Sequence, residues 1–317
     1  MDNFVEYKSE YICGEKLNKF KNELVTYFNN LYIALVNKLG ILKYVKKIII
    51  TDNFVEEVVS IQQELGYNPN VTNSKFGRAF GKVIKNSNEN NFYIVLDSSI
   101  ASYIVDDYLF EPIINELADG KLKESIINKR KMALNIFYHE LSHIEMDSTY
   151  EYEIGEENTV CNFLTNISYR LFQEYYATRR ALEYYGSFSI NSDSKFNEVE
   201  NIEKEIVDLK KKYKYREITL NDFVINFHEL FTLSLIYVIS YYANFYGQKH
   251  DFDRYETLNI ENHVSDIITA LDKLYNDFFE NNGIVFSNLN DVVLRYLESF
   301  NLFLTDTENG VYWSIPW

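Results

Sequence analysis

The chain has 317 residues, of which 46% are hydrophobic and 25% charged, a balance typical of a soluble protein with one large domain or two modest ones. Nucleic acids and anionic membranes need clustered lysines and arginines on a partner, so the formal net charge of −16 argues against both. With only 11 glycines and 3 prolines to interrupt helices, the chain is expected to be mostly helical.

The first part of the chain contains the one region in which the pattern predicts a sheet. It opens with an amphipathic helix at 14–40, in which apolar residues recur at three- and four-residue steps and Gly40 is the expected C-cap. A strand, a helix and two further strands are then expected in this order: 45–51, 53–66, 77–85 and 91–100.

The rest of the chain is predicted to be helical. The segment at 187–198 is rich in serine and asparagine and is the expected linker, and a highly charged helical segment follows it. The other helices are expected at 123–147, 161–186, 221–246, 261–281 and 287–303.

No membrane or secretion signal is predicted. The first residues lack a basic segment followed by an apolar one, so no signal peptide is expected and the predicted location is the cytoplasm. The most apolar run, 231–246, is shorter than the roughly 20 residues that span a bilayer, and it is interpreted as a buried core helix. Cys13 and Cys161 have no CxxC spacing, which argues against a cysteine metal site and favours two reduced thiols.

Two of the five histidines stand four positions apart in the segment NIFYHELSHIEMD, residues 135–147. Positions four apart lie on one face of a helix, so His139 and His143 can present both imidazoles to one metal ion. Glu140 lies about 100° further round the helix, where its carboxylate can take a proton from a metal-held water. The His-Glu-x-x-His pattern therefore predicts two ligands and one general base, and the competing interpretation is a helix with two incidental histidines.

A catalytic zinc site takes a third protein ligand and leaves a fourth position open. Glu174 is the predicted third ligand, because it lies within the next helix, after a loop long enough for that helix to return antiparallel. Ala177, one turn later, is small enough to allow close helix contact. The other acidic candidates point away round the helix or fall where carboxylates are usually solvated: Glu145, Asp147, Glu151, Glu153, Glu156 and Glu157.

The sequence HELSH followed by a helical EYYA resembles the gluzincin branch of the zincin metallopeptidases over roughly residues 45–186. The strand, helix, strand, strand order before the motif is also similar to the zincin core. The resemblance implies that the strand at 91–99 borders the cleft and holds extended substrate by main-chain pairing. It further implies one Zn²⁺ per chain, the base Glu140, and the ligands His139, His143 and Glu174.

The resemblance also points to supporting residues. Thr178 stands where the family pattern E-x-x-A-D has an aspartate that commonly buttresses a ligating histidine, so Thr178 itself or Asp147 is the expected substitute. Sites of this kind often take an oxyanion-stabilising histidine or tyrosine from a later helix. The candidates for that role are His228 and Tyr241, with Tyr237 and His263 also eligible.

These observations predict an α+β, predominantly helical protein with a zincin-like core and a helical C-terminal region. The expected divisions are an N-terminal helical segment at 1–44, the core at 45–186 and the C-terminal region at 187–317. The predicted function is that of a zinc-dependent metallopeptidase, which hydrolyses peptide bonds of a peptide or protein substrate by a metal-activated water. The alternative is a non-catalytic or single-partner regulatory metal-binding protein that keeps the same fold. The pattern does not specify the oligomeric state.

Overall fold

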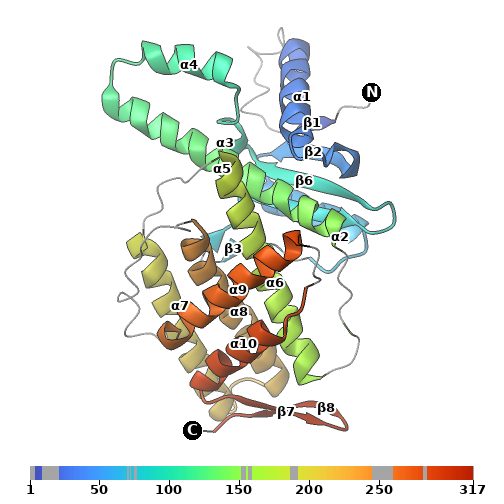
Figure 1. The fold of residues 1–317 in the computed structure, drawn as a ribbon, viewed down its shortest axis with the longest axis vertical. Helices are drawn as coiled ribbons and strands as arrows, with labels where there is room; N and C mark the ends of the chain where they lie inside the picture. The colour runs from blue at the N-terminus through green and yellow to red at the C-terminus, as the bar shows by residue number, and fades with distance from the viewer. Residues whose placement is uncertain are drawn as a thin grey trace. The chain divides into compact units, whose positions relative to one another are not determined.

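The chain folds as an α+β protein that is mostly helical and contains one small mixed sheet, as the sequence predicted (Figure 1). The computed structural model describes residues 4–8, 21–69, 71, 73–74, 77–150, 155, 159–185, 192–244, 260–280 and 284–316. The chain divides into two compact units. Unit 1 comprises Met1–Glu151 and Arg180–Ser189, and unit 2 comprises Tyr152–Arg179 and Ile190–Trp317. The limits predicted at 44/45 and 186/187 stay a prediction.

Unit 1 is built on a four-stranded sheet in the order β1-β2-β6-β5. β1, β2 and β6 are parallel, and β5 runs antiparallel to β6 at one edge. The strands are β1 (Val5–Lys8), β2 (Val45–Thr51), β5 (Gly81–Asn86) and β6 (Asn91–Asp97), with a separate short pair, β3 (Asn73–Ser74) and β4 (Gly77–Arg78).

The two faces of this sheet pack against different helices. Successive strand residues point to opposite faces, so Ile48 of β2 and Ile94 of β6 join a core with α1 (Lys21–Asn37) and α5 (Gly120–Thr149). Val95 points the other way and packs with α2 (Phe54–Glu64). Both faces of the central strands are therefore covered, which explains the continuous apolar stretches at 48–50 in β2 and 92–96 in β6. The remaining helices of unit 1 are η2 (Leu42–Tyr44), α3 (Ser98–Ala101) and α4 (Asp107–Glu116).

The sheet order corrects one expectation. The strand at 91–99 was predicted to border the cleft, but β6 pairs with β2 on one side and with β5 on the other, so neither edge of β6 is open. β5 is the edge strand on that side of the sheet. The predicted strand at 77–85 is divided between β4 and β5. β1 was missed, and the segment 1–44 is therefore not only helical.

Unit 2 is helical apart from a hairpin near the C-terminus (Figure 1). Its elements are α6 (Val160–Tyr185, which continues into unit 1 from Arg180), α7 (Ser192–Lys214), α8 (Leu220–Asn244), α9 (Glu261–Phe279), α10 (Ser287–Ser299), β7 (Phe303–Thr307) and β8 (Gly310–Ser314). Each predicted helix is present to within a few residues, although the predicted start at 14 and the predicted ends at 186, 246 and 281 lie outside the described residues. The predicted linker at 187–198 is wrong from Ser192 on, where α7 begins, and residues 187–191 lie outside the described residues.

The core of unit 2 is aromatic. Phe227 of α8 stacks on Phe223 and Phe231, one turn to either side, with ring centroids 5.8 and 5.2 Å away. Trp313 of β8 packs edge-on against Phe227 at 5.7 Å, so the hairpin closes over this stack. Edge-to-face and stacked ring pairs contribute about 0.5–1.5 kcal/mol each beyond their buried area.

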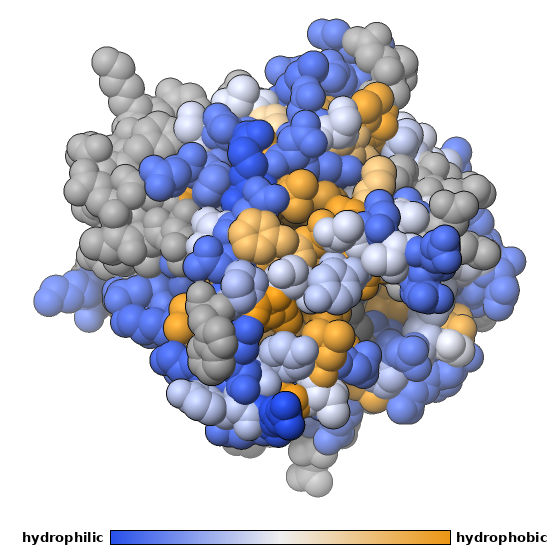
Figure 2. Space-filling model, turned by 90° about the horizontal axis from the view of Figure 1, so that it is seen from below, coloured by the Kyte–Doolittle hydropathy of each residue, from blue (hydrophilic) through white to orange (hydrophobic). Residues whose placement is uncertain are grey.

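α8 is long and apolar enough to cross a membrane, judged by length and composition over Leu220–Ala243. The core helix of a soluble protein meets the same criterion, and 44% of the most apolar stretch is buried inside the protein. Figure 2 shows the molecule from below the view of Figure 1. On that face, apolar residues gather near the centre and hydrophilic residues interrupt them. The helix is thus compatible with a soluble protein.

Candidate metal centre

α5 carries the His-Glu-x-x-His motif on a well-anchored helix. The Asp119 carboxylate caps its start by accepting hydrogen bonds from the backbone N–H groups of Lys121 (2.8 Å) and Leu122 (3.2 Å). A buried stripe at helical spacing holds the helix on the sheet: Leu134, Phe137, Leu141 and Ile144. His139 and His143 lie beside this stripe and are half-buried, so the amphipathic pattern leaves both imidazoles at the margin of the core.

The two imidazoles face each other. Their Nε2 atoms lie 3.1 Å apart, and the ring planes cross at 85°. Two nitrogen ligands of a tetrahedral zinc ion, each about 2 Å from the metal, are separated by roughly 3.3 Å. The distance between these histidines therefore fits two ligands of one ion.

Glu174 completes the group. Among the residues that the structure describes, the metal-competent group found is His139, His143 and Glu174, whose ligand atoms all lie within 4.8 Å of one another. Glu174 is half-buried, as the two histidines are, and its side chain can adopt several rotamers.

Glu140 lies against the first residue of the edge strand. Its side chain is buried, with 9% exposed. A Cβ placed on Gly81 would come within 2.7 Å of the Glu140 Cγ and 3.0 Å of its Oε1. Only glycine therefore leaves the observed space for the carboxylate. Gly81 was not predicted as a site residue, although a glycine in a strand pattern is a known sign of close backbone approach.

Glu174 sits on a turn of α6 that is fixed within unit 2. The next residue, Tyr175, is buried and donates a hydrogen bond to Asp272 of α9 (2.5 Å). Arg179 forms an ion pair with the same carboxylate at 2.7 Å. Burial raises the pKa of Tyr175, and the hydrogen bond to Asp272 raises it further, so the phenol stays protonated as a donor. These contacts hold the backbone that carries Glu174.

The end of α6 is fixed to α5 within unit 1. The Arg180 guanidinium forms a bidentate ion pair with Glu145. It donates through Nε to Glu145 Oε2 (2.9 Å) and through Nη2 to Glu145 Oε1 (2.6 Å). The Tyr184 ring stacks on Tyr138 at 5.5 Å and 18°. The prediction that Glu145 points away from the metal ligands is consistent with this pairing.

We expect Arg180→Met to lower the free energy of unfolding by about 1.5 kcal/mol, because the Glu145 carboxylate loses its bidentate ion pair. The two side chains are only 16% and 18% exposed, so solvent screens this pair weakly. Chemical denaturation measures the effect. The matched control is Arg295→Met, whose ion pair with Asp266 is 50% and 58% exposed and should contribute almost nothing. Equal effects of the two substitutions would contradict the expectation.

No protein-family model, curated protein or solved structure matches this chain. The chemistry of the group therefore rests on its residues and their geometry. Two imidazoles and one carboxylate form a nitrogen and oxygen donor set that suits zinc and leaves a coordination position for substrate or water.

The residues predicted to support the metal ligands or an oxyanion lie on helices of both units. Thr178 is buried on α6 and Asp147 is half-buried on α5, and neither belongs to the group of three ligand side chains. The oxyanion candidates all lie on helices of unit 2. His228 packs its ring on Phe163 at 5.6 Å, and burial, helped by the Arg170 charge, lowers its pKa. Tyr241 packs against its neighbour Tyr242.

Burial shifts the pKa of two further oxyanion candidates, as it does for His228. The His263 ring lies 5.9 Å from that of Tyr296, and burial lowers its pKa, so it is a packed histidine. Burial also raises the pKa of Tyr237. The oxyanion role of any of these residues, and the buttressing role of Thr178 or Asp147, stay predictions.

Proposed function

We propose that this protein is a zinc-dependent peptidase with a zincin-like core of the gluzincin type. One observation carries the proposal: the ligand atoms of His139, His143 and Glu174 lie within 4.8 Å of one another. This donor set is one that catalytic zinc sites of peptidases use, with a fourth position open to substrate. The buried carboxylate of Glu140, adjacent in sequence to the first ligand, supports a catalytic rather than a structural site.

Zinc held by these side chains would supply a Lewis acid, which polarises a peptide carbonyl and lowers the pKa of a water molecule to about 7. Glu140 performs the proton transfers. Its carboxylate accepts the proton of the attacking water and then passes it to the nitrogen of the leaving amine. The contact with Gly81 limits the positions that this carboxylate can take.

The edge strand offers a means of holding the substrate. No described strand of the sheet pairs with the outer edge of β5, and its first residue touches Glu140. An extended peptide can add to such an edge by main-chain hydrogen bonds, which give affinity with little dependence on side chains. β5 replaces residues 91–99 in this role.

The proposed substrate is a peptide or protein, and the proposed location is the cytoplasm. The net charge of −16 disfavours nucleic acids and anionic membranes as partners. In this proposal α8 is a core helix of a soluble enzyme and not a membrane anchor.

The proposal is tested by zinc content and cleavage together. The purified full chain should bind one zinc ion, measured by elemental analysis, and should cleave members of a random peptide library. A chelator should abolish cleavage and added zinc should restore it. His139→Ala, His143→Ala and Glu174→Ala should each lose stoichiometric zinc, because each removes one of three ligands.

The matched controls are His228→Gln and His263→Asn, which remove histidines outside the group of three and should leave the zinc content unchanged. A wild-type protein without stoichiometric zinc would overturn the proposal. Bound zinc without cleavage of any peptide would instead favour a metal-binding regulatory protein.

A further inference from the structure

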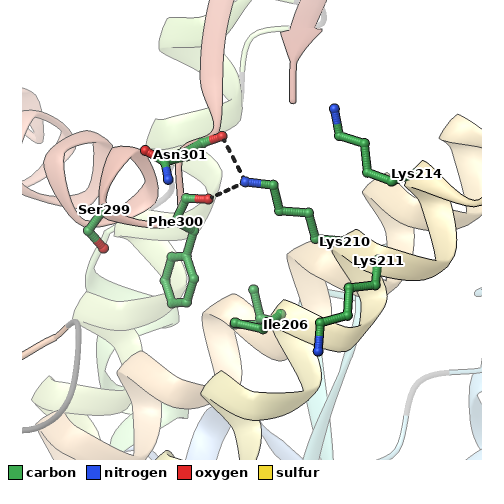
Figure 3. A pocket seen from close by; sticks show the side chains of 8 residues that line it. Ile206, Lys210, Lys211, Lys214, Ser299, Phe300 and Asn301 are labelled. Carbon is green, nitrogen blue, oxygen red and sulfur yellow. Dashed lines mark hydrogen bonds between the residues drawn. The ribbon is translucent and has the colours of Figure 1, made fainter. Parts of the chain in front are cut away.

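A pocket of about 360 Å³ lies in unit 2 between the C-terminal part of α7 and the end of α10 (Figure 3). Its apolar lining comes from Ile206, Val207 and Phe300. Ile206 and Phe300 are buried, while Val207 is 43% exposed and so presents an apolar side chain to anything that enters. A mostly apolar hollow of this size with a few polar groups is the usual composition of a small-molecule site.

The charged side chains that line this pocket are all lysines, and Ser299 and Asn301 are its uncharged polar residues. Lys210, Lys211 and Lys214 line it, and with Lys212 they make a run of lysines on the last turns of α7. The run stands out because the whole chain is acidic, with 47 Asp and Glu against 31 Lys and Arg. A local cluster of positive charge on an acidic protein favours a negatively charged ligand at that place.

Lys211 forms an ion pair with Asp208 of the same helix at 2.8 Å, and Lys210 caps the end of α10. The Lys210 ammonium donates hydrogen bonds to the carbonyl oxygens of Phe300 (3.0 Å) and Asn301 (3.4 Å), just past the end of α10 (Figure 3). Such a contact satisfies carbonyls that a helix end leaves unpaired. Burial lowers the pKa of Lys210, and the charge of Lys214 lowers it further. An anion near these lysines would offset that repulsion.

We propose that this pocket binds a small amphiphilic carboxylate. Its hydrocarbon chain would lie on Val207, Ile206 and Phe300, and its carboxylate would lie beside the ammonium groups of Lys210 and Lys214. The apolar lining selects the chain, and the charge of the lysines selects the anion. This site belongs to unit 2 and does not depend on the proposed peptidase function.

The test compares three ligands on the full-length protein: decanoate, decanol and acetate. Titration calorimetry should show saturable binding of decanoate that is about tenfold tighter than that of either comparison ligand. Decanol keeps the chain and lacks the charge, while acetate keeps the charge and lacks the chain. Equal affinity for decanol overturns the role of the lysines, equal affinity for acetate overturns the role of the apolar lining, and the lack of saturable decanoate binding overturns the site.

Substitutions of residues that line the pocket test whether decanoate binds there. Lys214→Gln should weaken decanoate binding about tenfold, since a hydrogen bond to a charged group contributes about 1.5 kcal/mol or more. Val207→Asp should weaken it to a similar extent, because it removes an apolar contact and adds a negative charge that repels the carboxylate. Both positions are partly exposed, so the fold should tolerate the changes, and thermal unfolding checks that it does. Lys212→Gln removes a neighbouring charge that does not line the pocket and should have no effect. Decanoate affinity that is unchanged in both pocket variants, or reduced equally by Lys212→Gln, contradicts the proposal.

Discussion

Glu140→Gln is expected to lower kcat for peptide cleavage by about 10³-fold while zinc stays bound. The amide has nearly the shape of the carboxylate, so packing against Gly81 persists. It cannot accept the proton of the attacking water at neutral pH, and therefore the proton transfers are lost. Initial rates on a peptide cleaved by the wild type, together with zinc content, measure both parts of the expectation.

The matched control is Glu124→Gln, which removes the same charge from an exposed position on the same helix. This variant should cleave at the wild-type rate. Glu140→Gln with full activity would exclude Glu140 as the base. Loss of zinc in Glu140→Gln would instead assign Glu140 to the ligands, a role that the proposal does not give it.

Gly81→Ala is expected to destabilise the protein by about 2 kcal/mol, the usual effect of forcing an extra methyl group into a packed site. The new Cβ would lie 2.7 Å from the Glu140 Cγ, closer than side chains tolerate, so either the base or β5 must move. Cleavage should fall strongly for the same reason. Chemical denaturation measures the first effect and initial rates measure the second.

A double-mutant cycle separates this contact from a general effect of the substitution. In a Glu140→Ala background the obstructing side chain is gone, so Gly81→Ala should have almost no effect on the free energy of unfolding. The matched control is Gly120→Ala at the start of α5, where an added Cβ meets nothing within 4 Å. An equal loss of stability in both Glu140 backgrounds would show that Gly81 does not act through Glu140.

The parts of the fold that were predictable from sequence are those that depend on local periodicity. α5 and α6 repeat apolar residues at three- and four-residue steps over many turns, and their observed bounds differ from the predicted ones by no more than three residues. β1 was missed because it has only four residues and includes two charged ones, Glu6 and Lys8. A strand so short is defined by its distant partner, since Val5 pairs with Ile48.

The error about residues 91–99 has a different cause. β6 is the last strand of this sheet in sequence, yet it lies in the interior between β2 and β5. The order of strands along the chain does not determine their order in a sheet. The apolar character of β6 was a usable sign of its interior position, because a strand covered on both faces and paired on both edges tends to be apolar throughout.

In the candidate site, too, the relations set by local geometry could be predicted and those set by long-range packing could not. The relation of His139 to His143 follows from helix geometry alone, and it could be predicted from their spacing. The proximity of Glu140 to Gly81 could not, because it depends on where β5 crosses α5 in the folded unit. Likewise, the pairing of Arg180 with Glu145 depends on how two helices pack, and local periodicity does not determine it.

The register of the sheet implies an order of assembly. β5 and β6 are joined by a tight turn at 87–90 that ends in Asn90, whose φ is +48°, so this hairpin closes a very short loop. The pairs Val5 with Ile48 and Ile48 with Ile94 must instead close loops of tens of residues, which costs more chain entropy and slows folding. We therefore expect the β5–β6 ribbon to form early and β1 to add late. The strand beside Glu140 would then keep its pairing even when the N-terminal edge of the sheet frays.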